Sequence, residues 1–309
     1  MIRLVAGLFS FLSIGAFAGV LGVGALVHIY GQGLPSHQEL VDYQPKMLSR
    51  VYAGDGRVIA QFARERRLFT PIEEVPPLVR NAFISAEDKN FYQHPGVDGI
   101  AIGKAITRFV LAKASGRNPQ LAGASGITQQ VVKNFLVGNQ RALERKVKEA
   151  ILAVRIDGAF SKDHILELYL NEIFFGARSY GVMAAAQNYF GKALEELTPA
   201  EAAYLAALPK KPSKLHPIRD HDDAVARRNY VLEEMAQNGH ITRAAAEASK
   251  AEPLITLVGT GGPDVLAAAE PTYFTAEIRR QLISDLGQDA LYEGGLTVRA
   301  TIDKRLQAE

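Results

Sequence analysis

Two adjacent acids, Glu87 and Asp88, stand near the end of an apolar segment that a Pro-Gly pair closes. The stretch reads SAEDKNFYQHPG over residues 85–96. A helix dipole disfavours negative charge at a helix C-terminus, so the position of the pair needs a reason. One reason is a solvated helix end, and the other is proton transfer by a positioned carboxylate. The pair alone does not decide between them.

A second cluster, GASGITQQVVKN, covers residues 123–134. Its glycines predict a flexible loop over 123–126, followed by a helix. On that helix Gln130 shares a face with Lys133 and Asn134, at spacings of three and four. One cation and several amides near a helix N-terminus suit an anion or a sugar phosphate. An ordinary polar helix face is the alternative.

A third cluster, RALERKVKEAILAVRID, covers residues 141–157 and places four cations within eight residues. These cations are Arg141, Arg145, Lys146 and Lys148, and Glu149 follows them. Arg145 and Glu149 are four positions apart, which permits an intrahelical ion pair worth about 0.2–0.5 kcal/mol. The alternative is a cationic wall for a diphosphate, with one carboxylate held inside it. The spacing leaves both interpretations open.

The elements that would position these clusters are mainly α-helices, predicted from about residue 75 to 250. Pro76-Pro77 predicts a helix start and Pro95-Gly96 a stop. Thr198-Pro199-Ala200-Glu201 predicts a capping box with proline at the first helical position. Residues 50–63 read as a hairpin around Gly54-Asp55-Gly56. After about 250 we expect a loop, a helix within 270–287 and a strand within 294–303.

The N-terminus predicts a membrane anchor. From Leu4 to Val27 the chain has 24 uncharged residues, enough to cross a bilayer as a helix. Arg3 is the one charge before it, so the positive-inside rule places the N-terminus in the cytoplasm and the rest outside. The apolar run continues past the Ala16-Phe17-Ala18 cleavage signal, which favours an uncleaved signal anchor.

These signals divide the chain into four predicted segments. Residues 1–30 are a cytoplasmic tip and transmembrane anchor, and 31–55 a juxtamembrane connector. Residues 56–235 form the catalytic domain, and 236–309 a linker with the start of a following region. The chain ends without a closing element, which suggests a fragment of a longer protein.

Composition limits the function classes. The 35 basic and 33 acidic residues nearly balance, so there is no global reason to expect nucleic acid and any anion site must be local. The absence of cysteine excludes disulfides, thiolate zinc sites and a cysteine nucleophile.

Five segments resemble, in order, the motifs of the peptidoglycan glycosyltransferase family, the lipid II polymerases of class A penicillin-binding proteins. The segments are EDKNFYQHPG, GASGITQQVVKN, RKVKEA, KDHILELYLNEIFFG and LTPAEAAYLAALPKKPSKLHP. The resemblance implies a mainly α, lysozyme-like domain with a membrane-contacting jaw, behind the transmembrane helix. It also implies that lipid II is joined with inversion into β-1,4-linked glycan, with release of undecaprenyl diphosphate.

The resemblance assigns roles to single residues. Glu87 matches the family's base, and a helix end with apolar surroundings would raise its pKa towards the working range. Lys133, Arg145 and Lys146 would neutralise the leaving diphosphate. Glu149 matches a second essential glutamate, near the diphosphate or a divalent metal (Mg or Mn) that it would bind. No organic cofactor is expected. The expected shaping or substrate-binding residues are Asp88, Phe91, His94, Ser125, Gln129, Gln130 and Asn134. For Phe91 and His94, packing and helix capping are the alternative.

The chain departs from the family at Gly126, where threonine is usual. Glycine can still serve as an N-cap, at a cost of a few tenths of a kcal/mol, but it brings no hydroxyl. The chain contains neither Ser-x-x-Lys nor Lys-Thr-Gly, so it is not expected to bind penicillin or cross-link peptides.

The implied location is the bacterial inner membrane, with the catalytic domain on the outer side. The implied partners are lipid II, the growing glycan strand and other cell wall synthesis proteins. Two rival interpretations are a lytic enzyme of lysozyme-like fold and a catalytically impaired scaffold. A lytic enzyme has no use for a diphosphate pocket.

Overall fold

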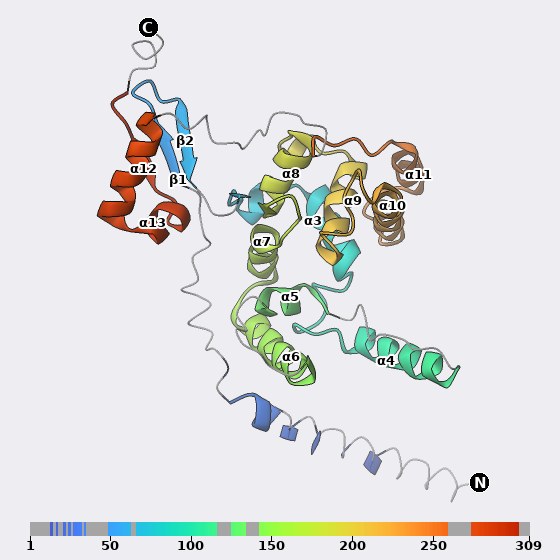
Figure 1. Cartoon of the computed structure of the whole chain (residues 1–309). Helices are drawn as coiled ribbons and strands as arrows, with labels where there is room; N and C mark the ends of the chain where they lie inside the picture. The colour runs from blue at the N-terminus through green and yellow to red at the C-terminus, as the bar shows by residue number, and fades with distance from the viewer. Residues whose placement is uncertain are drawn as a thin grey trace, which may run out of the picture. The chain divides into compact units, whose positions relative to one another are not determined.

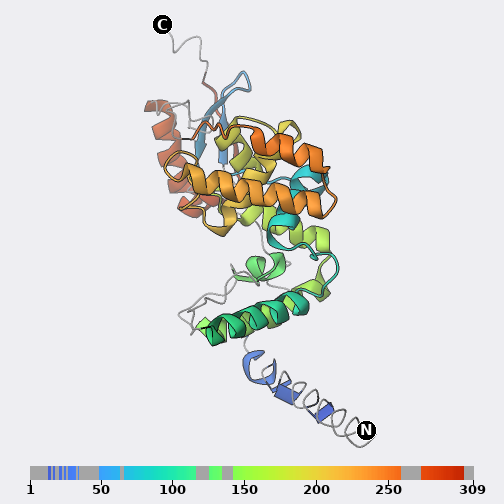
Figure 2. The same ribbon diagram turned by 90° about the vertical axis from the view of Figure 1, so that its right-hand side faces the viewer.

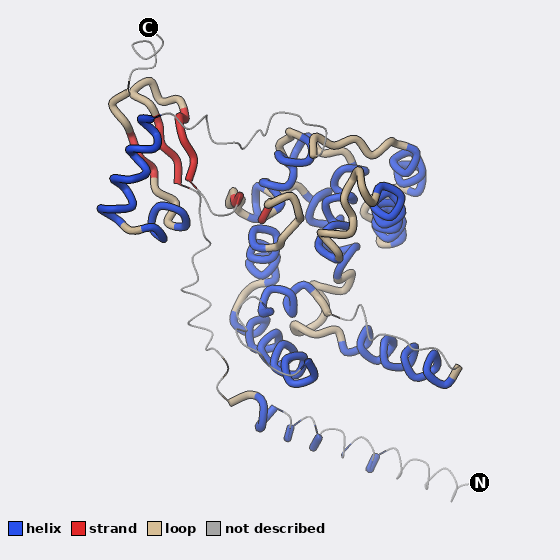
Figure 3. Tube along the Cα trace, viewed as in Figure 1, coloured by secondary structure: helices blue, strands red, loops and turns tan. Residues whose placement is uncertain are grey.

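The chain is mostly helical, as the sequence predicts (Figures 1 and 3). The computed structural model describes residues 13–14, 17, 21–22, 24–25, 27–32, 34, 49–62, 66–115, 125–133, 142–258 and 273–302. The predicted span from Leu4 to Val27 lies largely outside these residues. None of the helices that the structure describes combines the length and apolar character needed to cross a bilayer.

The chain forms two compact units. The first contains residues 1–43 and 91–162, and the second contains residues 44–90 and 163–309. The motif around Glu87 is therefore divided, because the two acids belong to the second unit and the sequence from Phe91 onward to the first. Each unit carries its own set of candidate functional residues.

Three helices pack together in the core of the second unit, namely α3 (Pro77–Glu87), α9 (Pro199–Ala207) and α10 (His221–Gln237) (Figure 1). Helix α3 begins with Pro77 at its first position and buries Val79, Ala82 and Phe83. A proline there costs nothing, because the first helical N–H has no partner within the helix. The predicted start of this helix is confirmed.

The predicted capping box of α9 is also confirmed. The Glu201 amide donates to Thr198 Oγ1 at 3.3 Å, and the Thr198 amide donates to Glu201 Oε2 at 2.9 Å. Lys192 lies just after α8 (Val182–Phe190), and its Nζ atom donates to Glu201 Oε1 at 2.7 Å. The capping box therefore satisfies the amides of Thr198 and Glu201 at this helix start.

Helix α7 (Lys162–Glu172) holds the segment before α3 through its polar side chains. Asn171 Oδ1 accepts from the Thr70 amide at 2.8 Å, and Asn171 Nδ2 donates to the Thr70 carbonyl at 2.9 Å. Glu167 Oε2 accepts from the Ile72 amide at 2.9 Å, at the start of the short helix η1 (Ile72–Glu74). The fourth motif thus fixes the approach of the chain to α3.

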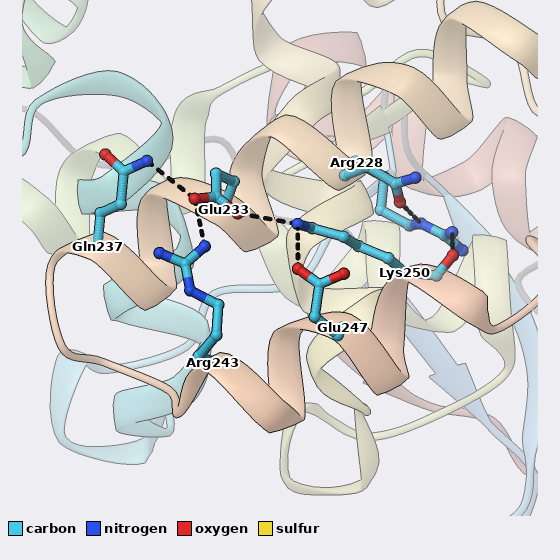
Figure 4. A network of polar contacts seen from close by, with 7 residues as sticks. Arg228, Glu233, Gln237, Arg243, Glu247 and Lys250 are labelled. Carbon is cyan, nitrogen blue, oxygen red and sulfur yellow. Dashed lines mark hydrogen bonds and ion pairs between the residues drawn. The ribbon is translucent and has the colours of Figure 1, made fainter.

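A buried arginine ties α10 to α11 (Arg243–Ala251), which run side by side (Figures 2 and 4). Arg228 is 1 % exposed and donates to the carbonyls of Glu252 at 2.7 Å and Lys250 at 3.0 Å. It thereby satisfies carbonyls at the end of α11. The predicted domain boundary after residue 235 falls inside α10, and the helical packing continues to α11.

An ion-pair network covers the same two helices (Figure 4). Glu233 pairs with Arg243 and with Lys250, whose Nζ lies 2.8 Å from Glu233 Oε2. Hydrogen bonds from Arg243, Lys250 and Gln237 lower the pKa of Glu233 to about 2. The carboxylate therefore stays charged in mild acid.

A small sheet joins distant parts of the second unit. Strand β1 (Ser49–Tyr52) pairs antiparallel with β2 (Val58–Phe62) and parallel with β5 (Thr297–Arg299). The predicted hairpin is confirmed, and it crosses the predicted boundary at residue 55. Helices α12 (Tyr273–Leu286) and α13 (Gln288–Glu293) precede β5, which confirms the expected helix and strand.

The remaining short elements of this unit are a second pair of strands and two 3₁₀ turns. Strands β3 (Arg66–Arg67) and β4 (Ser179–Tyr180) pair in parallel. The turns are η2 (Leu194–Glu196) and η3 (Leu208–Lys210). Because η3 directly follows α9, it places Lys210 of the fifth motif at the end of that helix.

The first unit contains α4 (Gly99–Ala114), α5 (Ile127–Lys133) and α6 (Ala142–Ala159). The loop before α4 lies directly on α6 at Gly96, which has φ +78°. A Cβ atom at Gly96 would stand 2.3 Å from the Ala153 carbonyl oxygen. Only glycine fits so close an approach with a left-handed backbone.

Candidate active site

The acid pair of the second unit lies at the end of α3, as predicted. Glu87 is the last residue of the helix, and its Oε1 atom is buried. Asp88 is the C-cap; it is 8 % exposed, and its amide donates to the Ile84 carbonyl at 2.9 Å. Two acids therefore sit, largely shielded from solvent, at the negative end of a helix dipole.

Two cations lie close to this helix end, and sequence reasoning did not assign either of them a role. Arg227 Nη2 on α10 donates to the Ala86 carbonyl at 3.4 Å, and its guanidinium lies 4.5 Å from the centre of the Tyr230 ring. The pKa of Lys210 on η3 is lowered by burial and by the charge of Arg227, and Glu87 opposes this shift. A cation at a helix C-terminus is favourable.

Tyr169 on α7 approaches the same helix end. Its ring packs edge-on against Phe83, with 6.2 Å between ring centres, and its side chain is 1 % exposed. Burial raises the pKa of Tyr169, and the charges of Glu87 and Asp88 raise it further. The negative charges of the acid pair therefore act on the Tyr169 phenol.

The first unit holds a buried carboxylate among cations. Glu149 on α6 is 1 % exposed. Lys146 Nζ donates to Glu149 Oε2, and Arg145 Nε lies 3.5 Å from Glu149 Oε1. The i, i+4 ion pair between Arg145 and Glu149 therefore exists, and the carboxylate is enclosed as well. The diphosphate wall stays a prediction.

The same lysine joins α6 to the start of α5. Lys146 Nζ donates to Ser125 Oγ at 3.0 Å. The Gly126 carbonyl accepts from the Gln130 amide at 3.1 Å, and the Gly126 amide donates to Gln129 Oε1 at 3.1 Å. Gly126 is therefore the N-cap of α5, and half of a capping box forms without the hydroxyl that threonine would bring.

The other residues of the second cluster are less closely joined. Gln129 is buried, Gln130 is half-buried and Lys133 is exposed at the end of α5. Lys133 makes no ion pair with any residue that the structure describes. Asn134 lies outside the described residues, so the predicted face of Gln130, Lys133 and Asn134 stays a prediction.

Phe91 and His94 have structural partners in the first unit. Phe91 is fully buried, and Lys162 Nζ lies 4.7 Å above its ring centre. The same Nζ atom pairs with Asp157 and donates to the His94 carbonyl at 2.6 Å. These contacts fasten the end of the first motif to the junction of α6 and α7.

A divalent cation would find few protein ligands near Glu149. Among the described residues, no group of three or more His, Cys, Asp or Glu side chains gathers to hold a metal. The ion-pair partners of Glu149 are the Lys146 ammonium and the Arg145 guanidinium, which suit an anion. A metal site at Glu149 would need substrate oxygens as ligands and stays a prediction.

Lys210, Arg227 and Tyr169 were not singled out from the sequence. Lys210 lies in the PKKPSK stretch and Arg227 in an Arg-Arg pair, so charge clustering was a usable signal for both. Tyr169 gave no such signal, because a tyrosine in an apolar helix is normally core.

Comparisons with known proteins show the family to which the chain belongs. Residues 55–236 match a family model described as "Transglycosylase". The chain is 44 % identical over 304 residues to "Penicillin-binding protein 1A" of Rickettsia typhi, covering 97 % of this chain and 38 % of that protein. It is 39 % identical over 291 residues to the protein of that name in Escherichia coli, covering 93 % and 33 %.

A crystal structure of penicillin-binding protein 1A from Haemophilus influenzae is similar at 26 % identity and a TM-score of 0.47. The match covers 86 % of this chain and 28 % of that one. The chain thus spans less than two fifths of the length of these relatives.

Proposed function

Because the chain belongs to the transglycosylase family, we propose that it is a peptidoglycan glycosyltransferase that polymerises lipid II during cell wall synthesis. The observation that carries the proposal is the enclosed Glu149, with Lys146, Arg145 and Ser125 around it. A paired cation cluster with a hydroxyl at a helix start is suited to a diphosphate. A glycan-cleaving enzyme releases no diphosphate and needs no such cluster.

Glu87 acts as the general base in this proposal. A sugar hydroxyl is a weak nucleophile at neutral pH, so its proton must move to a base as the new bond forms. The acceptor oxygen bonds to the anomeric carbon of the donor while the bond from that carbon to the diphosphate breaks. The proton goes to Glu87 and the electron pair leaves with the diphosphate. Attack opposite the leaving group inverts the anomeric centre.

The cations of α6 stabilise the leaving group. Charge develops on the diphosphate as the glycosidic bond breaks, and fixed cations facing that charge lower the barrier. Glu149 keeps the side chains of Lys146 and Arg145 in place by pairing with both. Lys133, exposed at the end of α5, adds a third cation to this role. A divalent cation, when bound, would supply further neutralisation of the diphosphate.

The family resemblance adds a lysozyme-like fold with a membrane-contacting jaw, and we assign that contact to α4. Ile100 is 69 % exposed and Leu111 is 62 % exposed on this helix. Exposed apolar side chains on one helix suit a lipid surface. Together with the predicted anchor at residues 1–30, they support a location on the outer side of the bacterial inner membrane. The relatives' name supports a longer parent protein with a penicillin-sensitive transpeptidase.

The test is polymerisation of purified lipid II by the full 309-residue chain in detergent. We expect glycan strands that a muramidase degrades. The matched pair of variants is Lys146→Gln and Lys148→Gln, since both lysines lie on α6 but Lys148 pairs with Glu144 at 2.8 Å instead. Loss of Lys146 should slow polymerisation about 10²- to 10³-fold, and loss of Lys148 should change it little.

Two outcomes would contradict the proposal. Release of soluble fragments from preformed glycan, without polymer from lipid II, would identify a lytic enzyme. Binding of lipid II without any product would identify a scaffold. Equal loss of activity in both lysine variants would remove Lys146 from the diphosphate site.

A further inference from the structure

Tyr169 is a buried tyrosine whose hydroxyl is unsatisfied. It makes no hydrogen bond with any residue that the structure describes. Tyr189, another buried tyrosine of the same unit, donates its hydroxyl to the Phe175 carbonyl at 2.8 Å. A buried hydroxyl without a partner costs free energy, so phenylalanine would be the more stable choice at residue 169. The hydroxyl therefore calls for a purpose other than packing.

The position of the ring indicates that purpose. Phe83 and Glu87 are four residues apart on α3, so they share one face of the helix. The ring of Tyr169 packs edge-on against Phe83, which directs it to the face that carries the acid. The raised pKa of Tyr169 agrees with this placement, because the charges of Glu87 and Asp88 both contribute to it after burial.

We propose that Tyr169 is a positioning residue for the base, with a hydroxyl that donates to the Glu87 carboxylate when that carboxylate is charged. The inference rests on the proposed function and adds a residue to it. A donor to the carboxylate favours its charged form, so the phenol keeps Glu87 deprotonated although burial opposes this. It also turns the charged oxygen towards the acceptor.

Other charged groups near Glu87 also affect its pKa, and their effect must be distinguished from that of the Tyr169 hydroxyl. Lys210 on η3 and Arg227 on α10 favour the charged form of Glu87, and Asp88 at the same helix end opposes it. On α9, which packs against α3, Glu201 is held in its capping box. A Tyr169→Phe variant leaves all of these groups in place. Any change in the titration of Glu87 then reports the hydroxyl.

The experiment compares Tyr169→Phe with Tyr189→Phe in the full chain in detergent. Three quantities are measured: the pH profile of kcat/KM for lipid II, the pKa of Glu87 by carbon-13 NMR, and Tm. The NMR signal is assigned with Glu87→Gln. For Tyr169→Phe we expect the Glu87 pKa and the acid limb of the profile to rise by about one unit. At pH values below the acid limb, kcat/KM should then fall about tenfold relative to the unaltered chain. Tm should stay the same or rise.

The control should behave in the opposite way. Tyr189→Phe leaves a backbone carbonyl without its donor, so Tm should fall while the pH profile stays unchanged. An unchanged Glu87 pKa in Tyr169→Phe would overturn the inference, and so would an equal shift in the control. The NMR titration needs no turnover. If the chain fails to polymerise lipid II, the proposed function is contradicted, but the titration still tests the link between Tyr169 and Glu87.

Discussion

Replacing Gly96 by alanine is expected to loosen the end of the first motif from α6. Gly96 has φ +78°, and a Cβ atom there would stand 2.3 Å from the Ala153 carbonyl oxygen and 2.6 Å from its carbonyl carbon. Both atoms belong to the backbone of a helix, so neither can rotate away. The loop must move instead. Lys162 donates to the carbonyl of His94, two residues before Gly96. Movement of the loop would therefore also disturb this hydrogen bond and the contact of Lys162 with the Phe91 ring.

The magnitude follows from two terms. A left-handed conformation costs a non-glycine residue about 1–2 kcal/mol, and overpacking costs about 1–3 kcal/mol. Their sum predicts a loss of about 2–5 kcal/mol in the free energy of unfolding. For a domain of this size that corresponds to a fall in Tm of about 4–20 °C.

The assay is thermal unfolding of the two variants Gly96→Ala and Gly158→Ala. Gly158 lies in α6, and no atom stands within 4 Å of a Cβ atom there. Alanine in a helix is favoured over glycine by about 0.5–1 kcal/mol, so Tm of this control should rise slightly. An unchanged Tm in Gly96→Ala would refute the close approach of the loop to α6.

Three further predictions concern stability and the α5 cap. Arg228→Met should lower the free energy of unfolding by about 2–5 kcal/mol, because the carbonyls of Lys250 and Glu252 at the end of α11 lose their donor. Denaturant titration measures the loss. The low pKa of Glu233 contributes stability above about pH 4.5 that is lost as the pH falls towards 2. Glu233→Gln should therefore flatten the decline of Tm in that window, and an equal decline would contradict the network. Gly126→Thr should raise turnover modestly and change the free energy of unfolding by less than about 1 kcal/mol, since Gln129 already bonds the cap amide; a fall in turnover would mean that the loop needs glycine.

Local signals in the sequence were sufficient for many helix and strand boundaries. Proline starts α3 at Pro77, and the capping box at Thr198 starts α9. The glycine-rich turn at 54–56 joins β1 and β2. Each of these depends on hydrogen bonds or sterics within a few residues, which the sequence displays directly. The parallel pairing of β1 with β5 joins residues about 250 positions apart, and no local pattern predicts it.

The sequence motifs named candidate site residues, but they did not predict which of these residues are buried or which neighbours they contact. Motif resemblance predicts Glu87 and Glu149 as site residues, and their roles stay a prediction. The structure adds that Glu149 is buried and paired with both Arg145 and Lys146. The spacing could not decide this, because burial depends on which face of α6 the rest of the unit covers. Arg227 reaches α3 from 141 positions along the chain. Such neighbours arise from packing of whole helices, so the sequence shows their charge but not their place.

The central claim is that Glu87 removes the proton of the acceptor hydroxyl. Its most direct test is the initial rate of lipid II polymerisation by Glu87→Gln, compared with the unaltered chain at equal folded concentration. The amide has nearly the same shape but cannot take the proton at neutral pH. We predict a loss of about 10²- to 10⁴-fold in rate with the fold unchanged by circular dichroism. A rate close to that of the unaltered chain would contradict the role of Glu87 as the base.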